Sequence, residues 1–140
     1  MVRAVLDANV FVSAAVRPDG PPGRVVERFL RGDAFELVLS HAIIDEVLRA
    51  LTYPKVRKYL RVGFDPKLWF EDIVVLSQLV AGQYKVAGVS KDPDDDKYLA
   101  AGVEGRAHFV VAGDSDLLDL REYEGLRIIS PRVFLDLLLS

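Results

Sequence analysis

The sequence contains no cysteine and only two histidines, His41 and His108. The absence of cysteine excludes disulfide bonds, thiolate catalysis and cysteine-bound zinc. Two histidines cannot by themselves hold a metal ion, so any metal site in this chain would be built on oxygen ligands. No evident nucleophile triad accompanies either histidine, and the phosphate-binding patterns GxxxxGKS/T and GxGxxG are absent.

Long apolar runs are lacking as well. No apolar stretch reaches the roughly 18 residues that a membrane-spanning helix needs. The first three residues lead directly into a strand-like run, without the long apolar segment of a signal peptide. We therefore expect a cytoplasmic protein with no membrane association.

The composition is that of a globular protein. The chain has 140 residues, of which 51% are hydrophobic and 28% are charged, and this length and balance are typical of one folded domain. The sequence has no internal repeat, no low-complexity tract and no linker long enough to separate two domains. We expect a single domain over residues 1–140.

Apolar strand-like runs alternate with helical patterns along the whole chain. Continuous apolar strands that alternate with helices indicate a parallel sheet covered on both faces, and hence an α/β fold. A short basic helical piece is expected after Pro54. Strands are predicted at 3–6, 35–39, 85–87, 108–112 and 126–129, and the longer helices at 9–16, 23–31, 42–52, 66–79, 92–103, 115–120 and 131–139.

Two carboxylates follow predicted strands at the point where each strand ends. Asp7 comes directly after Leu6, and Asp114 follows the strand at 108–112 after Gly113. In an open parallel sheet, ligands bind in the crevice outside the carboxyl ends of the strands. If the two strands are neighbours, both carboxylates face the same crevice.

Helical spacing places two further acids near that crevice. Asp96 shares the apolar face of its helix with Ala100 and Val103 but lies in the first turn. Burying it alone would cost several kcal/mol, so we expect it to meet a cation or a hydrogen-bond donor. The acids just before it have a structural explanation, because a first helical turn stabilises negative charge; among them Asp95 is the most ambiguous. Glu46 borders the apolar stripe of its own helix.

Charge is distributed unevenly, although the net charge is only −3. Residues 91–125 hold ten acids against four bases. This separation of charge is expected of a protein with a carboxylate site in one place and a basic, phosphate-binding surface in another. It is equally expected of a solvated basic helix together with acidic residues at the start of another helix. The segment 49–67 has one acid and six basic residues, which are Arg49, Lys55, Arg57, Lys58, Arg61 and Lys67.

Carboxylates that converge in an empty site cannot all ionise, because mutual repulsion raises their pKa values. A divalent cation resolves the conflict, and hard oxygen ligands favour Mg²⁺ or Mn²⁺. Such an ion lowers the pKa of a bound water and orients it toward a phosphodiester. The chemistry implied is hydrolysis of a nucleic acid whose backbone the basic segment holds.

Four segments occur in an order and at spacings that resemble a known family. They are VLDANVFVSA, LSHAIIDEVLRAL with YPKVRKYL after it, DPDDDKYLAAG, and FVVAGDSDLL. Together they resemble the PIN-domain family over essentially the whole chain, and within it the toxin-like ribonucleases of bacterial and archaeal toxin–antitoxin systems.

The resemblance implies a role for each matching residue. The third motif fits in two registers, and we choose Asp96 over Asp95 because an apolar run follows Asp96 as it does in the family. The four metal-binding acids are then Asp7, Glu46, Asp96 and Asp114, with Asp116 as an additional acid. The polar residues that would orient this shell or a phosphate are Asn9, Ser13, Ser40, Asp95 and Ser115.

The family further implies a three-layer α/β/α sandwich, dependence on Mg²⁺ or Mn²⁺, cleavage of RNA, frequent dimers and inhibition by a cognate antitoxin. The chain departs from the family at Ala112, where many members carry Thr or Ser two residues before the fourth acid. Ser115 is a hypothetical substitute for that hydroxyl. A PIN-like module that binds RNA or a protein without cutting is therefore the alternative interpretation.

Two other classes fit the sequence less well. A phosphoacceptor receiver module needs an acceptor Asp at the end of a central strand, whereas the middle run YKVAG ends without an acid. A phosphatase of the DxDxT/V type fails because Asn9 occupies the second acidic position.

Overall fold

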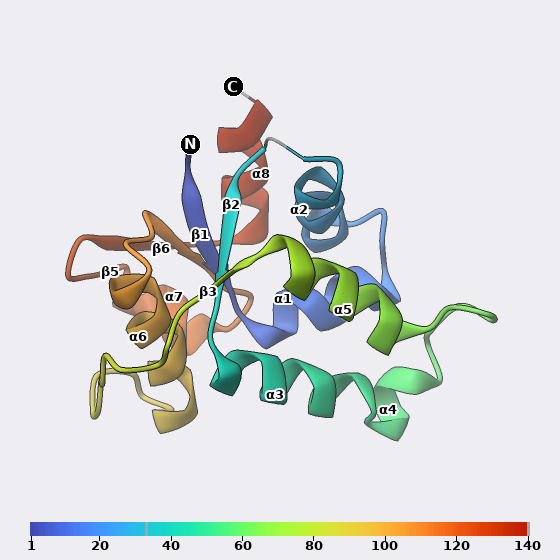
Figure 1. Cartoon of the computed structure of the whole chain (residues 1–140), viewed down its shortest axis with the longest axis horizontal. Helices are drawn as coiled ribbons and strands as arrows, with labels where there is room; N and C mark the ends of the chain where they lie inside the picture. The colour runs from blue at the N-terminus through green and yellow to red at the C-terminus, as the bar shows by residue number, and fades with distance from the viewer. Residues whose placement is uncertain (33, 140) are drawn as a thin grey trace.

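The computed structural model describes residues 1–32 and 34–139, and Figure 1 traces them from the N-terminus to the C-terminus. The strands are β1 (Arg3–Leu6), β2 (Glu36–Leu39), β3 (Gln78–Leu79), β4 (Phe109–Val111), β5 (Glu122–Tyr123) and β6 (Leu126–Ile129). The helices are α1 (Ala8–Val16), α2 (Pro21–Leu30), α3 (His41–Leu51), α4 (Pro54–Arg57), α5 (Pro66–Leu76), α6 (Asp96–Glu104), α7 (Ser115–Leu120) and α8 (Pro131–Leu139), with a 3-10 turn, η1 (Pro93–Asp95), directly before α6.

The strands form one mostly parallel sheet in the order β3-β2-β1-β4-β6-β5, in which only β5 runs antiparallel. Strand β1 lies between β2 and β4, and its residues Ala4, Val5 and Leu6 are fully buried. An interior strand covered on both faces has no polar side, which explains why β1 is a continuous apolar run. The predicted α/β class is confirmed.

Helices cover opposite faces of this sheet. On one face, Phe134 of α8 packs against Phe109 of β4, and the Arg127 guanidinium of β6 lies over the same Phe109 ring. Leu126, the residue before Arg127, points to the other face because successive side chains of a strand alternate. It contacts α6 there at Gly102. The sheet therefore lies between α8 and α6, as the three-layer prediction requires.

Polar side chains cap the N-terminal ends of α3 and α5. The Ser40 hydroxyl accepts a hydrogen bond from the Ile43 N–H at 3.3 Å and so caps α3. The Asp65 carboxylate accepts from the Leu68 N–H at 3.1 Å at the start of α5, where Pro66 occupies the first helical position. Both arrangements satisfy N–H groups that a helix leaves without an internal partner.

The sequence prediction of two segments was wrong. The helix that begins at Pro66 ends at Leu76, because the next residue is extended, and residues 78 and 79 instead form β3 beside β2. The predicted strand at 85–87 is a loop. Near this segment the N–H groups of Gly82 and Tyr84 donate to the Glu104 carboxylate of α6. Strand β5 was not predicted, since two residues carry no usable periodicity.

Within residues 1–32 and 34–139, no helix has both the length and the apolar character needed to cross a bilayer.

The contact between α6 and the sheet depends on a missing side chain at Gly102. A Cβ built there would lie 2.8 Å from Leu126 Cδ1, and Leu126 is 1% exposed and cannot move into solvent. Gly102→Ala is expected to lower the free energy of unfolding by about 1 kcal/mol, because overpacking outweighs the gain in helix propensity. Urea denaturation measures this change.

Gly20→Ala is the control for steric room, because the nearest atom to its new Cβ would be the flexible Arg17 Cδ at 3.4 Å, and any loss there reflects only the weaker N-cap preference of Ala at the start of α2. An unchanged or higher stability of Gly102→Ala would show that α6 does not approach the sheet so closely.

Candidate active site

Asp7 lies at the junction between β1 and α1, in the crevice at the carboxyl end of the sheet. One of its carboxylate oxygens accepts from the Val10 N–H at 2.9 Å and so caps α1, and the other accepts from the Gly113 N–H at 3.3 Å. Its backbone N–H donates to Val111 of β4 at 3.0 Å. These contacts fix a buried carboxylate, 2% exposed, between the two central strands.

The environment of Asp7 disfavours its ionised form. Burial raises the pKa of Asp7 from 3.8 to about 6. The negative charges of Asp114 and Glu46 are smaller contributions to this rise in pKa, while the hydrogen bonds from Val10 and Gly113 act in the opposite direction. Ionisation of Asp7 at neutral pH therefore destabilises the folded chain unless a cation binds beside the carboxylate.

Asp114 and Asp95 form the other side of the crevice. Asp114 caps α7, where its carboxylate accepts from the Asp116 N–H at 3.2 Å. Burial, a hydrogen bond with Asp114 and the charges of Asp114, Asp92 and Asp7 raise the pKa of Asp95 to about 7. In the part of the chain that the structure describes, Asp95 Oδ2 is buried without a hydrogen-bond partner. Asp7, Asp95 and Asp114 thus act on one another.

Asp96 has different partners. Its carboxylate accepts from the Ser90 N–H at 2.8 Å and from the Gly88 N–H at 3.0 Å. Although burial opposes ionisation, these hydrogen bonds hold the pKa of Asp96 below its usual value. The expectation that this buried acid meets a cation or a donor is met here by two backbone donors. The structure thus brings Asp95, rather than Asp96, beside Asp114.

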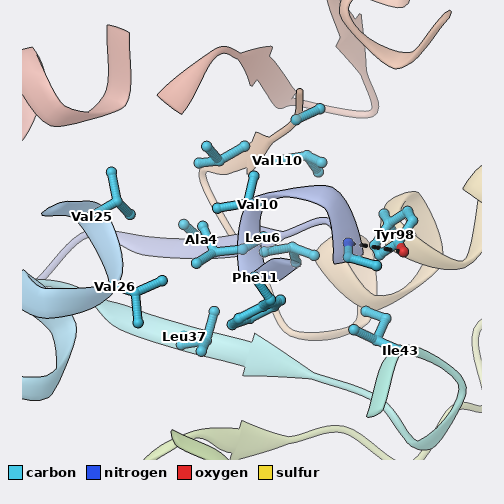
Figure 2. Close-up of a cluster of buried hydrophobic side chains, with 14 of the residues drawn as sticks. Ala4, Leu6, Val10, Phe11, Val25, Val26, Leu37, Ile43, Tyr98 and Val110 are labelled. Atoms are coloured by element: carbon cyan, nitrogen blue, oxygen red, sulfur yellow. Dashed lines mark hydrogen bonds between the residues drawn. The ribbon is translucent and has the colours of Figure 1, made fainter. Parts of the chain in front are cut away.

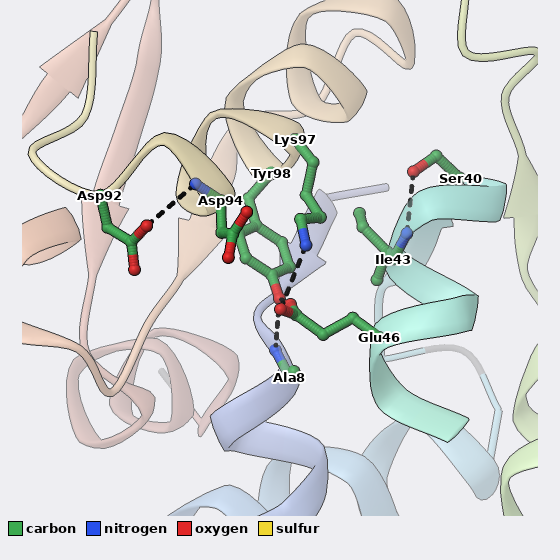
Figure 3. A network of polar contacts seen from close by, with 8 residues as sticks. All are labelled: Ala8, Ser40, Ile43, Glu46, Asp92, Asp94, Lys97 and Tyr98. Carbon is green, nitrogen blue, oxygen red and sulfur yellow. Dashed lines mark hydrogen bonds and ion pairs between the residues drawn. The ribbon is translucent and has the colours of Figure 1, made fainter. Parts of the chain in front are cut away.

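Glu46 of α3 reaches the crevice as part of a network that the sequence did not suggest. Figure 3 shows its carboxylate against the hydroxyl of Tyr98 and the ammonium of Lys97, both from α6. The Tyr98 hydroxyl donates to Glu46 and accepts from the Ala8 N–H at 3.1 Å. Lys97 Nζ lies 3.1 Å from Glu46 Oε2. The one feature of the sequence that could have drawn attention to these two residues is their position directly after the acids at 94–96.

Tyr98 joins this network to the core. Figure 2 shows its ring among buried side chains, and its hydroxyl accepts from the Ala8 N–H. The residue is 2% exposed. Burial and the hydrogen bond to Glu46 raise the pKa of Tyr98, so the hydroxyl keeps its proton.

The predicted polar residues lie at different distances from the crevice. Asn9 is exposed on α1, and its Cβ lies 3.9 Å from a Cβ built on Gly113. Ser13, one turn further along α1, lines a groove together with Lys55. Ser40 caps α3 and lines a separate pocket that Lys97 also lines. Asn9 is thus near the carboxylates, whereas Ser13 faces the basic segment.

The last of the four motifs runs from β4 into the first turn of α7. Ala112 is fully buried, and its N–H donates to Ile129 of β6 at 3.0 Å. Ser115 is exposed in the first turn of α7, and Asp116 beside it is half-buried. Both side chains therefore begin the same short helix that Asp114 caps.

The predicted basic residues are exposed along the end of α3, through α4 and beyond. The Arg61 guanidinium lies 4.6 Å from the centre of the Phe64 ring, and Lys58 Nζ lies 5.1 Å from that of Tyr59. Figure 1 shows α4 at the end of α3 that is far from the sheet. The exposed basic side chains are Arg49, Lys55, Arg57, Lys58, Arg61 and Lys67.

The donor set of the crevice fits a hard divalent ion. Within residues 1–32 and 34–139, no group of three or more His, Cys, Asp or Glu side chains is already arranged to hold a metal ion. Mg²⁺, however, usually takes one or two carboxylates and completes its shell with water and phosphate oxygens. Three interacting carboxylates, one with a buried unpartnered oxygen, meet that smaller requirement.

Comparison with known proteins identifies the class. The family model of the PIN domain matches residues 3–116, and the chain belongs to the PIN-domain family. It is 28% identical over 123 residues to the uncharacterized protein MJ1680 of Methanocaldococcus jannaschii, covering 86% of this chain and 76% of that protein.

The fold also has a counterpart among solved structures. It resembles a chain in the crystal structure of VapBC2 from Rickettsia felis bound to a DNA fragment from their promoter, with a TM-score of 0.58. The match covers 91% of this chain and 97% of that one at 10% sequence identity. At that identity the likeness concerns the fold.

The raised pKa of Asp7 makes stability depend on pH. The unfolded chain releases this proton near pH 3.8 and the folded chain near pH 6, so without divalent ions the free energy of unfolding falls as pH rises from about 4 to 7. The difference for Asp7 corresponds to roughly 3 kcal/mol. Asp7→Asn keeps the helix cap and is expected to flatten the profile by that order, leaving the Asp95 contribution.

Urea denaturation at a series of pH values measures this profile. Asp65→Asn is the matched control, because Asp65 caps α5 in the same way but is exposed. If the free energy of unfolding of Asp7→Asn falls with pH as steeply as that of the wild type, Asp7 is not the carboxyl group whose pKa burial raises.

Proposed function

We propose that this chain is a divalent-metal-dependent endoribonuclease. The observation that carries the proposal is the group of three interacting carboxylates at the carboxyl ends of β1 and β4, in which Asp7 is buried and Asp95 and Asp114 are half-buried. Two of these carboxyls have pKa values raised to about 6 and about 7, and Asp95 has an oxygen without a partner. Membership of the PIN-domain family and the resemblance of the four motifs to toxin-like ribonucleases support this function.

Asp7, Asp95 and Asp114 would hold Mg²⁺ or Mn²⁺, with Asp116 beside them as the additional acid. When bound, the ion supplies a water of lowered pKa and a positive charge next to the phosphodiester. Asp95 takes the place predicted for Asp96, because the Asp96 oxygens already accept from backbone N–H groups. Glu46 contributes through its contacts with Lys97 and Tyr98.

Other side chains would hold the RNA. Asn9 adds a neutral amide near the carboxylates, where it can orient a phosphate without adding negative charge. Ser13 and Lys55 share a groove along α1 and α4, which gives the RNA backbone a path from the crevice to the exposed basic segment. Ser115, exposed at the start of α7, would replace the hydroxyl that Ala112 lacks.

We further propose that the chain is one domain of 140 residues that acts in the cytoplasm as the toxin of a toxin–antitoxin pair. Its partners would be RNA, a cognate protein antitoxin and a second copy of the chain. The exposed apolar side chains Leu68, Val75 and Leu76 of α5 support a protein contact, since they are 57%, 81% and 58% exposed. The fold shared with a chain of the VapBC2 structure is consistent with this role.

The second candidate is a PIN-like module that binds RNA or a protein without cutting. Ala112 favours it, because this buried position offers no hydroxyl to a metal shell or a phosphate. The two candidates share the fold and differ in whether the chain cleaves RNA.

RNA cleavage separates the two candidates. Wild-type protein is expected to shorten a mixed RNA pool with Mn²⁺ and to leave it intact with EDTA. The Asp7→Asn and Asp114→Asn double variant is expected to lose at least about 100-fold in rate, because even residues that orient metal ligands are worth 10- to 100-fold. Gel analysis of the RNA measures both.

Asp19→Asn, a change on the loop between α1 and α2, is the control and retains full activity. Cleavage by the double variant at the wild-type rate would show that Asp7 and Asp114 are not part of the catalytic site. RNA that the wild type binds but never shortens would instead establish the second candidate.

The two neighbouring acids of the third motif are expected to behave differently. Asp95→Asn loses cleavage and the thermal stabilisation by Mn²⁺, because it removes a metal-binding charge. Asp96→Asn lowers the melting temperature without metal, since the Gly88 and Ser90 N–H groups lose a charged acceptor, but it keeps a Mn²⁺-dependent shift. Thermal scans with and without Mn²⁺ distinguish them, and the opposite pattern would restore Asp96 as the ligand.

A further inference from the structure

Lys97 is a cation already present beside the carboxylates. Its side chain is 19% exposed, and its ammonium lies 3.1 Å from Glu46 Oε2. Among the ion pairs of residues 1–32 and 34–139, this is the one that involves an acid of the crevice; Asp7, Asp95 and Asp114 have no basic partner within salt-bridge distance. The positive charge is therefore placed on the Glu46 side.

Both oxygens of Glu46 are occupied. Oε1 accepts from the Tyr98 hydroxyl and Oε2 pairs with Lys97 (Figure 3). The Tyr98 hydroxyl also accepts from the Ala8 N–H, so its own proton is directed at Glu46. If Glu46 turned toward a metal ion, this buried hydroxyl would lose its acceptor and Lys97 would lose its counter-ion. Each loss opposes the movement.

From this arrangement, we propose that Lys97 takes the place of a second metal ion. The chain would bind one divalent cation, on Asp7, Asp95 and Asp114, and Glu46 would position Lys97 instead of coordinating the metal. This inference rests on the proposed metal-dependent function and specifies its stoichiometry. The Lys97 ammonium and one divalent ion together carry three positive charges, against the four negative charges of Glu46 and the three aspartates.

Lys97 can also be reached from outside. It lines a pocket beside the crevice with Ser40, His41 and Lys85, and the two acids of the same pocket, Asp96 and Glu104, already accept hydrogen bonds from backbone N–H groups. An anionic phosphate oxygen that enters this pocket meets an ammonium whose position Glu46 fixes. Lys97 would thus bind a phosphate oxygen directly, while Glu46 is the residue that positions Lys97.

Counting bound Mn²⁺ tests the inference without any cleavage assay. Electron paramagnetic resonance of free Mn²⁺ and isothermal titration calorimetry give the number of ions per chain. We expect one ion for the wild type, one for Lys97→Arg, which keeps the charge, and two for Lys97→Met and Lys97→Gln, which release Glu46. Lys91→Met removes the same charge from an exposed neighbouring lysine and is expected to keep one.

Circular dichroism confirms that each variant is folded before it is titrated. Two ions on the wild type, or a single ion of unchanged affinity on both neutral Lys97 variants, overturns the role of Lys97 and leaves the ribonuclease proposal standing. No Mn²⁺ bound by the wild type overturns both.

Discussion

The pairing of β1 with β4 is the constraint on which the rest of the crevice depends. It places Leu6 opposite Val111, and the next N–H, that of Asp7, still donates to Val111 across the sheet. The strand can be buried on both faces only because its side chains are apolar, and it must end where a polar one appears. Asp7 meets both demands, because it ends the strand and its carboxylate begins α1.

That same placement explains why the crevice is electrostatically strained. Asp7 stabilises the helix start through Val10, yet its burial raises its pKa to about 6. Asp114 repeats the arrangement one strand away, since it caps α7 and faces Asp95. The two capping carboxylates, Asp7 and Asp114, thus lie close to each other. Each stabilises the start of its own helix, and the repulsion between them offsets part of that stabilisation. A fold arranged in this way is relieved by added positive charge.

The sequence predicted those parts of the site that follow from strand ends. Asp7 and Asp114 were placed correctly in one crevice, because the carboxyl ends of neighbouring parallel strands share an edge. It favoured Asp96 over Asp95, whereas the structure has Asp95 beside Asp114, because the chain passes there from a 3-10 turn into α6 and the helical face is undefined at that step. Strand β3 was missed for a related reason, since two residues show no alternation.

The contacts of Lys97 and Tyr98 were out of reach for a different reason. Their partners Glu46 and Ala8 are about 50 and 90 residues away in sequence, and only the packing of α6 against α3 and β1 brings them together. A local pattern carries no information on such pairs. The KY pair could be marked as interesting, but its contacts required the structure.

The loop between β3 and η1 is held by two carboxylates of α6. Glu104 accepts from the N–H groups of Gly82 and Tyr84, and Asp96 accepts from those of Gly88 and Ser90. All four donors are backbone groups, which nearly every amino acid possesses. The path of this loop consequently needs glycine at positions 82 and 88, whose φ angles are +79° and +73°, and depends little on its other side chains. Its other exposed side chains can therefore change without removing the four hydrogen bonds that hold the loop on α6.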